Sequence, residues 1–132
     1  DNIFKDAKAV QVETEAVVEA NPEYIIKVSA PDVYSSYYPP TEEEHLAIKE
    51  ELCSRPGFDE IDAVKNDNIL LLSHYVHGGA SKIVGALYIA KFLYPEQLPE
   101  LHPEQVFRDW LEKYQGLDYI EGHTYPKFTF ED

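Results

Sequence analysis

The clearest hydrophobic pattern lies in the middle of the chain. An apolar run at Ile69–Leu72, short enough for a buried strand, is followed by a polar turn and then by an apolar segment of helical length, Ser81–Tyr94. A strand, a glycine-containing turn and a helix form half of a βαβ unit, and α/β folds place ligand sites at that turn. Because Lys82 and Lys91 are the only charged residues of this segment, we expect the helix to be buried on more than one side.

The rest of the chain alternates between strand and helix patterns. Thr14 and Thr41 stand where helix caps are expected, and Thr41 with Glu44 forms a capping box. Pro103 and Gly116 suit the two ends of the last helix. The remaining predicted strands are Val10–Val12 and Tyr24–Val28, and the remaining predicted helical segments are Glu15–Ala20, Thr41–Cys53, Ile61–Val64 and Glu104–Gln115.

These elements predict one α/β domain over residues 1–132. We expect a three-layer Rossmann-like fold with a short, mostly parallel central sheet flanked by helices. The tail 117–132 is expected to add an edge strand or to lie across the domain. Helix periodicity predicts two sets of buried residues: Leu46, Ile48 and Leu52 on one helix, and Val106, Phe107, Trp110, Leu111 and Tyr114 on the other.

Charge narrows the possible partners. The net charge is −14, which argues against nucleic acid and against an anionic membrane surface, since both are bound through Lys and Arg. Cys53 is the only cysteine, so an internal disulfide and a thiolate metal cluster are excluded. No segment has the length of a membrane span or the pattern of a signal peptide. The start at Asp1, without Met, predicts an excised domain or a processed product.

Two stretches carry candidate binding residues. The loop 31–40 contains Tyr34, Tyr37 and Tyr38, which form either a binding surface or a layer folded onto the core. In the turn after the central strand, His74 and His77 flank Tyr75. These histidines either contact a ligand or are structural, and we assign no metal to them because the loop has no carboxylate to complete a ligand set. We expect His45 on a solvated helix face and His102 at a cap; His123 lies in the unassigned tail.

Catalysis is not expected. The sequence contains no nucleophile elbow, no H-E-x-x-H pattern and no convincing carboxylate pair. The turn before the long apolar helix lacks the spacing of a P-loop and of a dinucleotide-binding loop. We therefore predict a protein that is not an enzyme and has no intrinsic cofactor.

The order of four stretches resembles a known family. NIFKDAKAVQVETEAVVEANPEYIIKV, SRPGFDEIDAVKNDNILLLS, GGASKIVGALYIAKFLYPE and LHPEQVFRDWLEKYQG resemble, in this order, passages of the ABC-transporter substrate-binding proteins that handle iron-siderophores, haem and cobalamin. The resemblance covers about residues 1–116 and implies two α/β lobes, joined by a long helix, that enclose the ligand. This chain resembles the C-terminal lobe.

The resemblance also implies site residues and partners. Glu15 matches a glutamate that docks onto the permease, and Gln11 and Val12 match cleft positions. The turn 73–82 matches the ligand-facing loop, in which Gly79 is retained and Ser81 stands where many relatives have arginine, with Lys82 beside it. The side of the lobe that faces the ligand would then contain Gly79, Ser81 and Lys82 together with Tyr34, Tyr37, Tyr38, His74, Tyr75 and His77.

The implied partners are an N-terminal lobe, a permease and a ferric siderophore, haem or cobalamin-like ligand, in an extracytoplasmic location. The alternative is a stand-alone protein-interaction domain, or one that forms homodimers through the same surface. A metal- or corrinoid-dependent enzyme is the weakest of the three interpretations.

Overall fold

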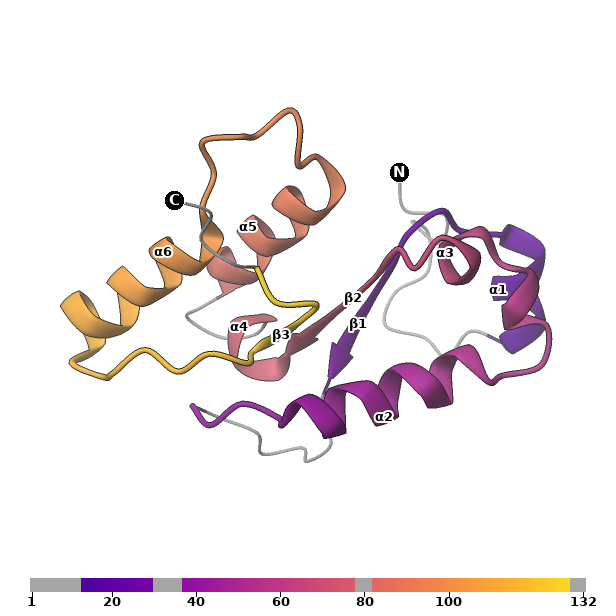
Figure 1. The fold of residues 1–132 in the computed structure, drawn as a ribbon, viewed down its shortest axis with the longest axis horizontal. Coiled ribbons are helices and arrows are strands. Elements are labelled where there is room, and N and C mark those ends of the chain that lie inside the picture. The colour runs from indigo at the N-terminus through magenta and orange to yellow at the C-terminus, as the bar shows by residue number, and fades with distance from the viewer. Residues whose placement is uncertain (1–12, 30–36, 78–81, 129–132) are drawn as a thin grey trace.

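The structure, a computed structural model, describes residues 13–29, 37–77 and 82–128. Helices and strands alternate along the chain, which confirms a mixed α/β domain (Figure 1). The predicted strand Val10–Val12 lies outside the described residues. The elements are α1 Thr14–Ala20, β1 Ile25–Ser29, α2 Glu42–Cys53, a 3₁₀ turn Phe58–Glu60, α3 Asp62–Lys65, β2 Ile69–Ser73, α4 His74–His77, α5 Lys82–Leu93, α6 Pro103–Asp109, a π-helical turn Trp110–Gln115 and β3 Thr124–Tyr125.

The strands that the described residues form lie in the order β1-β2-β3, with β2 in the centre. β1 runs parallel to β2, with Ile25 opposite Ile69, whereas β3 runs antiparallel, with Tyr125 opposite Leu71. The sheet is therefore mixed rather than mostly parallel. The difference arises because the tail folds back along β2, so that it supplies the edge strand that was one of its two predicted roles.

The central strand is buried on both faces. Successive side chains of a strand point to opposite sides, so Leu70 and Leu72 enter one core while Ile69 and Leu71 enter the other. The first core is shared with α5 and α6, and the second with α2 and the segment around α3. Each fully buried side chain of this kind stabilises the folded domain by about 1.5–3 kcal/mol relative to an exposed one. β2 thus joins the two helical groups that Figure 1 shows on either side of it.

The expectation that α5 is buried on more than one side is wrong. Val84, Gly85 and Tyr88 are buried, but Ile83 is 73% exposed and Tyr94 is 51% exposed. The helix packs against α4, α6 and β2, whereas Lys82, Ile83 and Ala86 on its other side are exposed. Sequence could not show this, because an apolar outer face has the same composition whether or not another element covers it.

The last helix follows its predicted pattern only in part. Phe107 and Leu111 are buried, whereas Val106 is 38% exposed and Tyr114 is 77% exposed. Trp110 packs at the edge of the core, with its ring 6.3 Å from that of Phe107. The π-helical turn rotates the last residues away from the face that a regular helix would present. Gly116 ends this turn with a φ of +64°, as its position predicted.

Of the two predicted threonine caps, one is confirmed and one is wrong. The Thr41 Oγ1 accepts a hydrogen bond of 3.2 Å from the backbone N–H of Glu44, which confirms this N-cap. α1 instead begins at Thr14 with Glu13 as its N-cap residue, so the prediction of Thr14 as the cap is wrong by one position. Leu46 is exposed although it was predicted to be buried, while Leu52 is buried as expected.

Candidate functional site

The turn that follows β2 is held by an unusually close packing of two helices. A Cβ atom added at Gly85 in α5 would lie 2.3 Å from the carbonyl oxygen of Val76 in α4. Glycine at this position allows the backbones to approach. The contact fixes the start of α5 against α4, which carries His74, Tyr75 and His77.

Three of the four tyrosines predicted to form a rim lie together. The ring of Tyr37 is 5.2 Å from that of Tyr38 and 6.2 Å from that of Tyr75, with edge-to-face geometry. Tyr38 is 74% exposed, whereas Tyr37 and Tyr75 are half-buried. Tyr34 lies outside the described residues. The described tyrosines therefore form a surface with a buried base and an exposed tip, which we call the tyrosine cluster (Tyr37, Tyr38 and Tyr75).

The other candidate ligand residues stand near the same end of the central strand. His74 and His77 are exposed on α4, and Lys82 is exposed at the start of α5. Gly79 and Ser81 lie outside the described residues. Aromatic faces, imidazoles and an ammonium group can stack on a conjugated ligand and bind an anionic substituent.

A buried histidine that the sequence left unassigned supports the tyrosine cluster. His123 is 2% exposed, and Tyr75 stacks on its ring at 5.2 Å. Its Nε2 lies 2.9 Å from the carbonyl oxygen of Tyr37, an acceptor, so Nε2 carries the hydrogen. Nδ1 is then an acceptor, and the Ser73 Oγ donates to it at 2.6 Å. Burial lowers the pKa of His123 to about 4, so the ring is neutral at physiological pH.

The prediction for His45 is wrong. This residue of α2 is 1% exposed, and its Nε2 donates to the carbonyl oxygen of Gly122 at 2.7 Å. Burial is the largest cause that lowers the pKa of His45. Its Nδ1 is buried and has no hydrogen-bond partner among the described residues. The tail, 77 residues away in sequence, covers the helix face that would otherwise be solvated.

The positions of His102 and Glu15 agree more closely with the sequence interpretation. His102 is the N-cap residue of α6, although its side chain makes no capping hydrogen bond. Glu15 is exposed in the first turn of α1, as expected. In Figure 1, α1 lies at the right-hand end of the domain and the strands β1 and β2 lie between it and α4, so Glu15 is separated from the tyrosine cluster.

The described residues offer little for other chemistry. No group of three or more His, Cys, Asp or Glu residues within 13–29, 37–77 and 82–128 could hold a metal ion. Burial raises the pKa of the Cys53 thiol, which disfavours the reactive thiolate. A hollow of about 10 Å³ between Tyr88, Phe107 and the tail has room for about one water molecule.

None of the helices in the part of the chain that the structure describes is long and apolar enough to cross a membrane. Comparison with known proteins gave no identification. No protein-family model matches the chain, and no curated protein shows significant similarity to it.

Proposed function

We propose that this chain is one lobe of the solute-binding component of an ABC importer. The lobe captures an iron chelate, haem or a cobalamin-like ligand together with an N-terminal lobe and delivers it to the permease. The protein acts outside the cytoplasm, as a periplasmic or membrane-anchored binding protein. The finer fold that we propose is a three-layer Rossmann-like domain, which the parallel pair β1–β2 and the helices on either side of it support.

The observation that carries this proposal is the tyrosine cluster beside α4. Two segments far apart in sequence meet there, since Tyr37 and Tyr75 have ring centres 6.2 Å apart. Exposed His74, His77 and Lys82 lie on the adjoining elements. A conjugated, anionic metal chelate presents flat faces and carboxylate or hydroxamate oxygens, which aromatic rings and cationic side chains bind.

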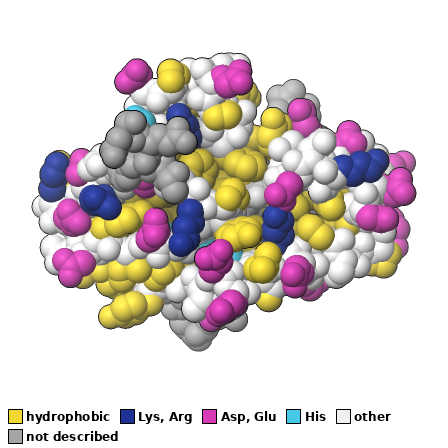
Figure 2. All heavy atoms as spheres, viewed as in Figure 1, with side chains coloured by type: hydrophobic (Ala, Val, Ile, Leu, Met, Phe, Trp, Pro, Cys, Tyr) yellow, Lys and Arg dark blue, Asp and Glu magenta, His cyan; other side chains and the backbone are white. Residues whose placement is uncertain are grey.

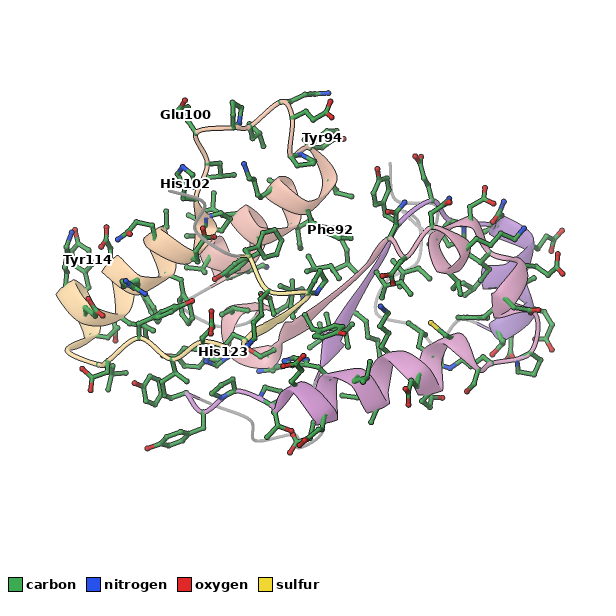
Figure 3. All side chains as sticks on the ribbon, in the orientation of Figure 1. Phe92, Tyr94, Glu100, His102, Tyr114 and His123 are labelled. Atoms are coloured by element: carbon green, nitrogen blue, oxygen red, sulfur yellow. The ribbon has the colours of Figure 1, made fainter. Side chains whose placement is uncertain are left out.

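Exposed apolar side chains elsewhere support a two-lobe arrangement. Tyr24, directly before β1, and Ile26, within β1, are each 37% exposed, and the ring of Tyr24 contacts that of Phe92 at 5.9 Å. Figure 3 shows Phe92 on the side of α5 that faces the sheet. Figure 2 shows hydrophobic side chains gathered in the centre of the face drawn, bordered by charged ones. A contiguous apolar surface of this kind is typical of a contact with another protein domain.

Tyr38 provides the direct test of ligand binding. We expect Tyr38→Ala to weaken the affinity for the cognate chelate about tenfold, because an aromatic contact contributes roughly 0.5–1.5 kcal/mol beyond its buried area. Haem, cobalamin and ferric siderophores are titrated into this chain and into any longer protein that carries it, and binding is read from the visible bands of the ligand.

Tyr114 is the matched control, because it is 77% exposed on the π-helical turn and, among the described residues, its ring contacts none of the tyrosine cluster. Tyr114→Ala should bind as the unmodified protein does. An equal loss in both variants, or no binding of any of these chelates by either protein, would contradict the proposal.

The proposed role of Glu15 is tested separately. An exposed carboxylate at a helix start can pair with an arginine through two hydrogen bonds. We expect Glu15→Gln in the complete binding protein to reduce transport about tenfold or more while leaving ligand affinity unchanged. Glu19→Gln, on the exposed part of the same helix, is the control and should transport normally. Equal transport by the two variants would remove Glu15 from the docking surface.

The second candidate function is a stand-alone interaction or self-assembling domain. The exposure of Ile83 on α5 and of Tyr94 directly after it favours this function, since these side chains are apolar and lie open to solvent. The ligand titration separates the two functions. Binding of a chelate supports the importer component, whereas its absence in both proteins favours the interaction domain.

A further inference from the structure

The C-terminal segment Asp118–Tyr125 contacts the end of the tyrosine-bearing loop at several points. The Tyr37 hydroxyl donates to the carbonyl oxygen of Asp118, and the His123 Nε2 donates to the carbonyl oxygen of Tyr37. A Cβ atom at Gly122 would lie 3.4 Å from the Pro39 side chain. The described end of the loop is therefore positioned by the tail.

The same segment is attached to the rest of the domain through two buried histidines. The Ser73 N–H donates to the carbonyl oxygen of His123 at 2.7 Å, and the Ser73 Oγ donates to the His123 Nδ1. From the other side, the His45 Nε2 donates to the carbonyl oxygen of Gly122. The hydrogen bond from the Ser73 Oγ requires the neutral His123 ring with its hydrogen on Nε2, whereas the Nε2 donors of both histidines would remain after protonation.

Protonation of His123 would place a positive charge on a buried ring and would remove the acceptor of the hydrogen bond from the Ser73 Oγ. His123 is enclosed by the Ser73 hydroxyl of β2, the Tyr75 ring of α4 and the Phe107 ring of α6. Among the described residues, no carboxylate forms an ion pair with either histidine ring.

The remaining ionisable groups nearby do not change this result. Glu121 and Lys127, which line the hollow beside His123, pair with each other at 3.7 Å. Glu44 favours the charged form of His45, but burial outweighs it. The charged forms of His45 and His123 also repel each other.

We propose that Asp118–Tyr125 is an acid-sensitive strap, which holds Tyr37–Pro40 in place while His45 and His123 are neutral and loosens when they are protonated. Loosening would release the backbone of Tyr37 and, with it, the base of the tyrosine cluster. An effect of acid on ligand release rests on the proposed function. The loosening itself does not, because it requires no ligand.

Hydrogen exchange of the protein without ligand tests the strap. If the His123 ring has a pKa of about 4 in the closed strap and about 6.5 in the open one, the open population rises roughly 70-fold between pH 7.5 and pH 4.5. After correction for the intrinsic exchange rates, we expect the exchange of the amides of Tyr37, Tyr38 and 118–125 to accelerate by this factor. The amides of Leu70–Leu72 in β2 should remain better protected than those of the strap at both pH values, because they exchange only when the whole domain unfolds.

Two variants test whether protonation of His123 causes the increase in exchange. His123→Gln keeps an Nε2 donor for the Tyr37 carbonyl oxygen but cannot be protonated in this range, so its increase should fall to about threefold or less. His102→Gln removes an exposed histidine and should retain the full increase. As a measurement that needs no variant, the imidazole NMR signal of His123 should titrate over the pH range in which the strap amides lose protection.

Three results would overturn the inference. They are equal protection of the strap at both pH values, strap amides that are as well protected as those of β2 at pH 4.5, and a full response in His123→Gln. Because no ligand is present, each of these would reject the strap and leave the proposed function untouched.

Discussion

Replacement of Gly85 by alanine is expected to destabilise the domain by about 2 kcal/mol, whereas helix propensity alone predicts a gain of about 1 kcal/mol. The new Cβ atom would lie 2.3 Å from the carbonyl oxygen of Val76 and 3.2 Å from the Cα of His77. Both are backbone atoms, so α4 and α5 must move apart and lose part of their contact. The sign of the effect therefore distinguishes a close helix contact from an ordinary helical glycine.

Urea unfolding and thermal melting measure this change, and the midpoint Tm should fall by about 8 °C. Gly116→Ala is the matched control. Its Cβ meets no atom within 4 Å, but its φ is +64°, so only backbone strain of about 1 kcal/mol is expected. A Gly85→Ala protein more stable than the unmodified chain would show that the two helices do not approach so closely.

Lowering the pH from 7 to 4 is expected to remove roughly 3 kcal/mol of unfolding free energy through His123, whose pKa is about 4 in the folded protein. The unfolded ring accepts a proton near pH 6.5, so between these two values the unfolded chain binds more protons than the folded one. The contribution is fully present above about pH 6.5 and is lost as the pH falls toward 4. His45, whose pKa is also lowered, adds to the loss in the same direction.

Unfolding in urea at several pH values measures this dependence. The slope of the unfolding free energy against pH is compared between the unmodified protein and His123→Gln. The slope of the variant should be smaller by the contribution of His123. Protonation of carboxylates also changes the stability of a chain with net charge −14, but it does so in both proteins and cancels in the difference. Parallel slopes would show that His123 titrates normally in the folded state.

Local features of the fold could be predicted from the sequence. The run Ile69–Leu72 became the central strand, because a short, continuously apolar segment is stable as a strand covered on both faces. Thr41 caps α2, and Gly116 adopts the left-handed conformation that ends the last helix. Each of these outcomes depends on residues within a few positions of one another.

The candidate site was predicted only in part. Tyr37, Tyr38 and Tyr75 stood out by residue type, and the structure brings them together although 38 positions separate Tyr37 from Tyr75 (75 − 37 = 38). His123, which supports them, gave no signal, since an isolated histidine in a tail has the same sequence appearance whether it is exposed or buried. Figure 3 shows it near β3, within the body of the domain.

The sequence by itself therefore determined where helices and strands form, since periodicity, caps and turn residues act over a few neighbouring positions. Only the tertiary structure decided which helix faces are covered. α5 is open on one side, and His45 is buried because Gly122, 77 residues away, lies over it. Burial depends on contacts between segments distant in the chain, and such contacts leave no mark in the local pattern of hydrophobic and polar residues.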